Sequence, residues 1–129
     1  MVYVIDTHAL VWFLEGNTKL SETAKAILAD PDAQLVIPSI VLAETAHLYA
    51  RKRISVDAQK ILKKIASADN CTVYPLDEQV ALTVSGSLDI HDAIIVATAM
   101  IYRDTLKEDV AIVTNDQRIT ESGLINIVW

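Results

Sequence analysis

The chain has 129 residues, of which 52% are hydrophobic, so it predicts one globular domain over 1–129 and excludes a disordered chain. Its formal net charge of −6 argues against a protein that attracts nucleic acid through its overall field. The longest nearly apolar run, 93–102, is too short to cross a bilayer, and no basic residue precedes Asp6, so we expect a cytoplasmic protein without a secretory signal. Cys71 is the only cysteine, which excludes an intrachain disulfide, and we interpret it as a core residue.

In the first half of the chain, short β-branched runs alternate with segments of helical periodicity. Ser21 and Ser39 are predicted helix caps, while Gly16 and the Asp30-Pro31 pair are predicted helix ends. Pro38 closes the second strand. The predicted order is strand 2–5, helix 9–14, helix 21–29, strand 35–37 and helix 39–51.

The second half continues the alternation, with a strongly apolar helix near its centre. The predicted order is helix 56–68, strand 72–76, helix 77–85, helix 91–102, strand 111–113 and strand 125–129. Strands that alternate with helices predict an α/β fold, with a mainly parallel sheet covered by helices on both faces. Ligands of such sheets bind beyond the carboxyl ends of the strands, and we therefore searched that edge for chemistry.

Four acids fall where this edge is expected. Asp6 directly follows the first strand, and Asp116 comes two residues after Thr114 at the end of a later strand. Glu44 lies about a turn and a half into the helix after the second strand, and Asp92 lies near the start of the apolar helix. Helices that follow parallel strands begin at the same edge, so the four carboxylates can converge, although the sequence leaves the strand order open.

Each acid taken alone has an ordinary explanation. Asp6 suits a helix cap, Asp92 suits a first helical turn, and Asp116 after Asn115 suits a turn. Glu44 is harder to explain in this way, because it shares a helix face with apolar residues, as Asp92 also does. Burial of an unpaired charge is costly, and no lysine or arginine lies at helical spacing on either face.

A bound cation explains the whole set. Two carboxylates about 5 Å apart repel each other by roughly 3 kcal/mol at an effective dielectric constant near 20. Oxygen-only ligand sets suit hard cations such as Mg²⁺ or Mn²⁺. We therefore predict a site in which the metal ligands, and the catalytic residues, are Asp6, Glu44, Asp92 and Asp116.

Four segments of the chain together resemble the PIN-domain family, especially its VapC toxins from toxin–antitoxin pairs. The segments are Val4-Ile5-Asp6-Thr7-His8-Ala9-Leu10-Val11-Trp12, then Lys19-Leu20-Ser21 with Ala43-Glu44, then Asp92-Ala93-Ile94-Ile95-Val96-Ala97-Thr98-Ala99, and finally Val113-Thr114-Asn115-Asp116. They cover nearly the whole chain in the family's order and spacing. One departure is Asp89-Ile90-His91-Asp92-Ala93, where a close subgroup carries Asp-Pro-x-Asp-Arg.

The resemblance implies a PIN α/β/α sandwich and Mg²⁺-dependent cleavage of RNA to 5′-phosphate and 3′-hydroxyl ends. It also implies a cognate antitoxin and a homodimer. It gives Thr7 and Thr114 the role of hydroxyls that hold the metal ligands. Asp89 either shares that role or caps the helix 91–102, and we favour the cap. An apolar surface near 10–14 would receive an antitoxin helix.

Other functions fit the sequence less well. A phosphatase of the haloacid-dehalogenase type needs a second aspartate two residues after Asp6, where this chain has His8. A phosphoacceptor receiver domain needs a late lysine, and none follows Lys107. A di-iron bundle needs two Glu-x-x-His pairs, and Glu44 with His47 is the single pair. A non-catalytic PIN module that binds RNA or a protein remains the alternative.

The histidines and large aromatic residues are interpreted as supporting groups. His8 and His91 each neighbour a predicted ligand, so we expect partly exposed side chains that line the mouth of the site rather than ligands. Trp12 and Phe13 are expected in the core or in a dimer contact. Aromatic residues make up 5% of the chain, which does not favour an extended stacking platform for bases.

Overall fold

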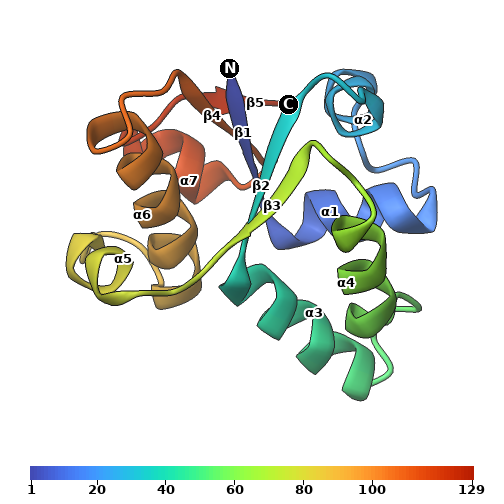
Figure 1. Ribbon diagram of the computed structural model, residues 1–129. Helices are drawn as coiled ribbons and strands as arrows, with labels where there is room; N and C mark the ends of the chain where they lie inside the picture. Colours follow the sequence, from blue (N-terminus) through green and yellow to red (C-terminus); the bar gives the residue numbers. More distant parts are fainter.

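The computed structural model describes all of residues 1–129 and contains one parallel sheet (Figure 1). The strands have the order β3-β2-β1-β4-β5, and every neighbouring pair is parallel. The prediction of a mainly parallel sheet is therefore confirmed. The strands are β1 (Val2–Ile5), β2 (Gln34–Pro38), β3 (Cys71–Tyr74), β4 (Val110–Val113) and β5 (Ile127–Val128).

Seven helices cover the sheet. Figure 1 shows α1, α2 and α4 on one side of the strands and α5, α6 and α7 on the other, which is the expected α/β/α arrangement. No helix combines the length and the apolar character that a bilayer crossing requires. The helices are α1 (Thr7–Glu15), α2 (Glu22–Ala29), α3 (Ser39–Ala50), α4 (Ala58–Ala66), α5 (Glu78–Thr83), α6 (Ile90–Asp104) and α7 (Gln117–Ser122).

The ends of the helices follow local signals in some places and tertiary contacts in others. Ser21 caps α2 as predicted, since its Oγ accepts a hydrogen bond from the Ala24 amide at 3.0 Å. Gly16 ends α1 in the left-handed conformation, with φ of 65°, which glycine adopts without steric penalty. The prediction that Ser39 caps α3 is wrong, because its Oγ accepts from the Leu76 amide at 2.9 Å and Pro38 occupies the cap position.

β1 lies at the centre of the sheet, between β2 and β4, and its buried residues join the largest hydrophobic cluster of the protein. Both faces of β1 and β4 are covered, which explains why these strands are nearly continuous apolar runs. In the register of the sheet, Ile5 pairs with Val113, so the residues that follow them, Asp6 and Thr114, leave the sheet side by side. The strand order thus brings segments more than 100 residues apart to one edge.

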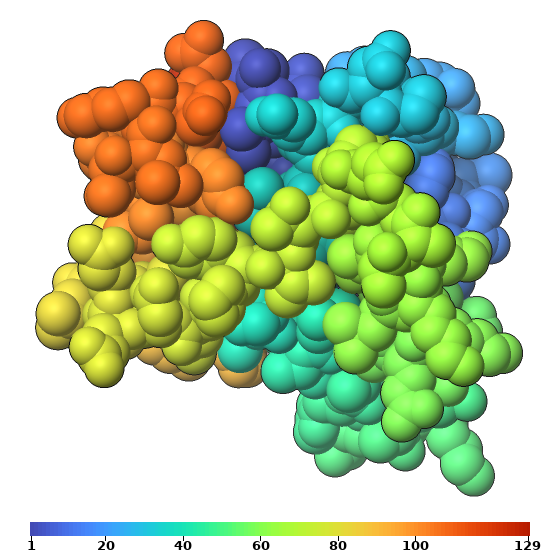
Figure 2. Space-filling model, viewed as in Figure 1, coloured from blue at the N-terminus to red at the C-terminus, as the bar shows by residue number.

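The carboxyl ends of the strands form the lower edge of the sheet in Figure 1, where α3 and α6 begin. The second half of α3 and the loop after it project beyond the rest of the surface in the space-filling view (Figure 2). The side chains of His47, Tyr49 and residues 51–53 on this projection are exposed. The first half of α3, which carries Glu44, stays packed against the sheet edge through the buried Val41.

Candidate metal centre

Asp6 is the most buried of the predicted ligands, with 7% of its surface exposed. Its Oδ1 accepts a hydrogen bond from the Ala9 amide at 2.8 Å and so caps α1, while its Oδ2 accepts a hydrogen bond from the Thr114 hydroxyl. Burial raises the pKa of this carboxyl above its usual value, although both hydrogen bonds oppose the shift. Asp6 is therefore a fixed carboxylate in a poorly hydrated place at the end of the central strand.

Glu44 reaches the same place from α3. The hydroxyl of Thr7, itself buried, donates to Glu44 Oε1 at 3.1 Å. Because Thr7 directly follows Asp6, this bond ties the glutamate of α3 to the end of β1. The two hydroxyls assigned by the resemblance, Thr7 and Thr114, thus each hold one of the predicted ligands.

Asp92, in the first turn of α6, completes the group from the opposite layer of the sandwich. Burial raises the pKa of its carboxyl most, and the negative charges of Asp116, Glu44, Asp89 and Asp6 raise it further. Asp6, Glu44 and Asp116 come from other elements of the fold than Asp92, and the charge of each acts on the Asp92 carboxyl.

Asp116 follows β4 and begins α7. Its Oδ1 accepts from the Ile119 amide at 3.1 Å, and its own amide donates to the Thr114 hydroxyl at 3.0 Å. The ordinary explanation of Asp6 as a helix cap is thus correct for one of its oxygens, and Asp116, which was explained as part of a turn, also caps a helix with one oxygen. A carboxylate has about four lone-pair sites, so capping leaves acceptors available for a cation.

Asp89 differs from the prediction. It occupies the cap position of α6, but its side chain makes no capping hydrogen bond. Instead, Asp89 Oδ2 accepts from Nη1 of Arg118 on α7, at 2.8 Å. Arg118 is not among the residues predicted from the sequence, because α7 was not predicted. With one buried residue, Ile119, this short helix has no apolar periodicity to reveal it.

No lysine or arginine forms an ion pair with the predicted ligands, and His8 is the basic side chain whose charge opposes the rise in the pKa of Asp6 that burial causes. The two ion pairs of the structure are Arg118–Asp89 and Arg103–Asp104, and neither includes one of the four acids. The carboxylates also do not close into a cage, since no three acid, histidine or cysteine side chains are placed to hold one ion together. Mutual repulsion favours such an open arrangement. The donor set itself, carboxylate oxygens without a lysine or arginine counter-charge, is of the kind that would hold a hard divalent cation.

A small pocket of about 160 Å³ opens beside these acids. It is lined by Asp6, Asp116, His8, Trp12 and Asn115. His8 is exposed here, which agrees with the prediction that it lines the mouth of the site. Trp12 packs against the core and meets His8 and Trp129 with ring centroids 5.4 Å and 6.0 Å away. Asp6 and Asp116 are therefore reachable from solvent through an opening that Trp12 and His8 line.

A larger apolar groove of about 350 Å³ lies away from the acids, in the layer of α1, α2 and α4. Leu10, Phe13 and Leu14 of α1 form part of its wall, so it includes the surface that the sequence analysis singled out. Cys71 also lines this groove, partly buried, and burial raises the pKa of its thiol. The thiol is therefore a weak nucleophile at neutral pH, in line with its interpretation as an apolar filler.

Comparisons with known proteins agree with the architecture. A search of curated proteins found no significant match. A chain of the crystal structure of VapBC2 from Rickettsia felis, bound to a DNA fragment from their promoter, is similar with a TM-score of 0.65 and 16% identity, over 99% of this chain and 98% of that chain. The PIN domain of RRP44 from T. brucei is similar with a TM-score of 0.61 and 16% identity, over 98% of this chain and 75% of that chain.

At this identity, the two solved structures establish a shared fold only. The sequence profile of the PIN domain family matches residues 3–123, which include the four acids and both threonines. Because this match covers most of the sequence, the chain belongs to the PIN domain family.

Proposed function

We propose that this PIN domain is a Mg²⁺-dependent endoribonuclease and the toxin of a VapC-type toxin–antitoxin pair. The observation that carries the proposal is the gathering of Asp6, Glu44, Asp92 and Asp116 at one sheet edge without a lysine or arginine partner. Acids used only for structure are normally paired or solvated, whereas here burial, together with the negative charge of the neighbouring acids, raises the pKa of Asp6 and of Asp92. Mn²⁺ is a chemically similar substitute.

The cation, when bound, would polarise a phosphate oxygen and make a water molecule more acidic. The task of the protein is then to hold the ligands in place. The Thr114 hydroxyl fixes Asp6 Oδ2, and the Thr7 hydroxyl fixes Glu44 Oε1. In the hydrolysis, a water oxygen bonds to phosphorus, the bond from phosphorus to the 3′-oxygen breaks, and one proton passes to that oxygen.

The toxin assignment is supported by the fold shared with the VapBC2 chain and by the apolar groove. An amphipathic helix of an antitoxin would bury apolar side chains against Leu10, Phe13 and Leu14 there. We also propose a homodimer, which analytical ultracentrifugation of the purified protein would detect.

The direct test is cleavage of a labelled single-stranded RNA by the wild type and by Asp6→Asn, with Mg²⁺ and with chelator. Asparagine preserves the cap of α1, so the variant should stay folded. We expect metal-dependent cleavage by the wild type and a loss of at least about a hundredfold in the variant, because metal catalysis supplies several kcal/mol. Equal cleavage by the two proteins would remove Asp6 from the mechanism.

A non-catalytic PIN module that binds RNA or a protein is the second candidate. Thermal unfolding separates it from the nuclease, since a ligand that prefers the native state raises the melting temperature. At a hundred times its dissociation constant, Mg²⁺ would stabilise the fold by about 2.7 kcal/mol. A melting temperature that does not respond to millimolar Mg²⁺ or Mn²⁺ would favour the module.

A further inference from the structure

Arg118 forms an exposed ion pair at the rim of the acidic site. It lies in the first turn of α7, two residues after Asp116, and binds Asp89, three residues before Asp92. The side chains of Arg118 and Asp89 are both 72% exposed. The pair therefore connects the starts of the two helices, α6 and α7, at which two of the four predicted ligands lie.

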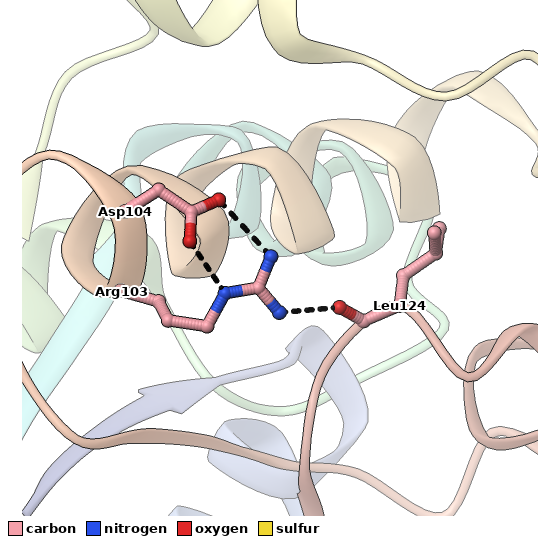
Figure 3. Close-up of polar contacts among 3 residues, drawn as sticks. All are labelled: Arg103, Asp104 and Leu124. Atoms are coloured by element: carbon pink, nitrogen blue, oxygen red, sulfur yellow. Dashed lines mark hydrogen bonds and ion pairs between the residues drawn. The ribbon is translucent and has the colours of Figure 1, made fainter.

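Arg103 forms the other ion pair of the protein, and its guanidinium binds protein groups only. Its Nε and Nη2 donate to the two carboxylate oxygens of Asp104 at 2.7 Å and 3.0 Å, and its Nη1 donates to the Leu124 carbonyl at 2.7 Å (Figure 3). All three nitrogens are used, and the side chain joins the end of α6 to the loop before β5.

Arg118 uses its guanidinium differently. It makes one hydrogen bond, from Nη1, and its Nε and Nη2 have no protein partner. A guanidinium carries five N–H donors in a planar fork that matches the oxygens of a phosphate. Asp89 thus holds the group at the rim and leaves most of its donors free for another acceptor.

The charge of the site explains why such a group is needed. An RNA phosphodiester is an anion, and it must approach four carboxylates in a protein with a formal net charge of −6. One divalent cation does not offset four carboxylates. A fixed positive group on the rim lowers the repulsion of the backbone and gives it a defined position.

We infer that Arg118 binds a phosphate of the RNA next to the metal centre, and that Asp89 positions its guanidinium. Asp89 acts through Arg118 and does not touch the substrate. This inference rests on the proposed function, because it assigns the residue that receives the substrate of that same site. The alternative is that the pair merely joins α6 to α7, which an exposed ion pair does weakly.

The experiment measures both the binding and the cleavage of the labelled single-stranded RNA with Mn²⁺, over a range of substrate and salt concentrations. We expect Arg118→Ala to raise KM about tenfold with little change in kcat, because a hydrogen-bonded charge pair is lost. Arg118→Lys should raise KM about threefold, because lysine keeps the charge and loses the fork. The slope of log affinity against log salt should become shallower by about 0.7 in Arg118→Ala, the value for one phosphate contact on a single strand.

Arg103→Ala is the matched control, since it removes an arginine that is also paired with an aspartate but stands roughly 16 Å further along α6 than Asp92. It should leave KM and the salt slope unchanged. As a single substitution, Asp89→Ala should raise KM about threefold. When it is added to Arg118→Ala, it should not raise KM further, because the double variant has no guanidinium to position.

The outcomes separate the inference from the proposed function. A wild type that neither binds nor cleaves the RNA with Mn²⁺ contradicts both. If the wild type cleaves while Arg118→Ala keeps the same KM and salt slope, the nuclease stands and the phosphate contact is wrong. If Asp89→Ala lowers KM in the presence of Arg118, Asp89 acts only as a repelling charge and does not position the arginine.

Discussion

The two ends of α6 carry aspartates with opposite surroundings. Asp104, at the far end, accepts two hydrogen bonds from Arg103, which lower the pKa of its carboxyl. Asp92, at the carboxyl edge of the sheet, has no basic partner, and burial together with other acids raises its pKa. The charge of Asp104 is neutralised within the chain, whereas the charge of Asp92 is not.

The contrast between Asp104 and Asp92 distinguishes an acid that is neutralised within the protein from one that is not. A pairing such as that of Arg103 with Asp104 is complete without any ligand (Figure 3). Asp92 has no such partner, and the acids around it raise its pKa further. The cation that would offset these charges also suits phosphate chemistry.

The largest effect is expected at Asp92, and the matched substitution at the other end of α6, at Asp104, is its control. Asp92→Asn should reduce RNA cleavage by at least about a hundredfold, because one of the proposed ligands is lost. Asp104→Asn should leave cleavage unchanged, since Asp104 lies roughly 18 Å further along the helix. Initial rates at saturating Mg²⁺ measure both. Similar rates for both variants would mean that the two ends do not differ in function.

A smaller effect is expected from the hydroxyl that holds Asp6. Thr114→Val should lower cleavage about tenfold, as for other residues that orient a metal ligand, with a weaker response to Mg²⁺. Thr98→Val is the control, because Thr98 is equally buried and its hydroxyl bonds the Ile94 carbonyl within α6. Were the two variants equally active, the bond from Thr114 to Asp6 would serve packing only.

The smallest effect concerns stability without metal. The pKa values of Asp6 and Asp92 are higher in the folded protein than in the unfolded chain, so protonation of these carboxyls stabilises the fold. This stabilisation is fully present below the unfolded pKa near 3.8, and it is lost as the pH rises through the pKa values of the folded protein. In chelator, the wild type should therefore lose more stability than Asp6→Asn between pH 4 and neutrality. At neutral pH the variant should be more stable by about 1 kcal/mol, because asparagine places no charge in this poorly hydrated position.

Thermal melts of both proteins in chelator across this pH range measure the difference, which corresponds to a few degrees in melting temperature. Addition of Mg²⁺ should reverse the order, because the wild type gains a ligand that Asp6→Asn binds poorly. Parallel pH profiles for the two proteins would show that Asp6 is not destabilised by its surroundings.

The sequence predicted all five strands because each is a short apolar run bounded by turn residues, as Val2–Ile5 and Val110–Val113 illustrate. It predicted the four acids because their residue types and positions after strands follow local rules. The strand order was not predictable, since pairing of β1 with β4 joins segments about a hundred residues apart. This strand order places Thr114 beside Asp6, so that the Thr114 hydroxyl can donate a hydrogen bond to the Asp6 carboxylate.

Local rules failed where a distant partner competed for a side chain. Ser39 and Asp89 both stand at the start of a helix, and the sequence assigned each to capping. In the structure, Ser39 binds the Leu76 amide and Asp89 binds Arg118. The role of Arg118 could not be recognised from the sequence, because the short α7 buries only Ile119. That role depends on Asp89, which is distant in the sequence.

A structure of crystals soaked in Mn²⁺, recorded with anomalous scattering, tests the central claim most directly. We expect a peak at the edge of the sheet, ligated by oxygens of Asp6, Glu44, Asp92 and Asp116 that have rotated inward from their open arrangement. Mn²⁺ bound only elsewhere, or an unchanged and empty acidic edge at saturating concentration, would contradict the account.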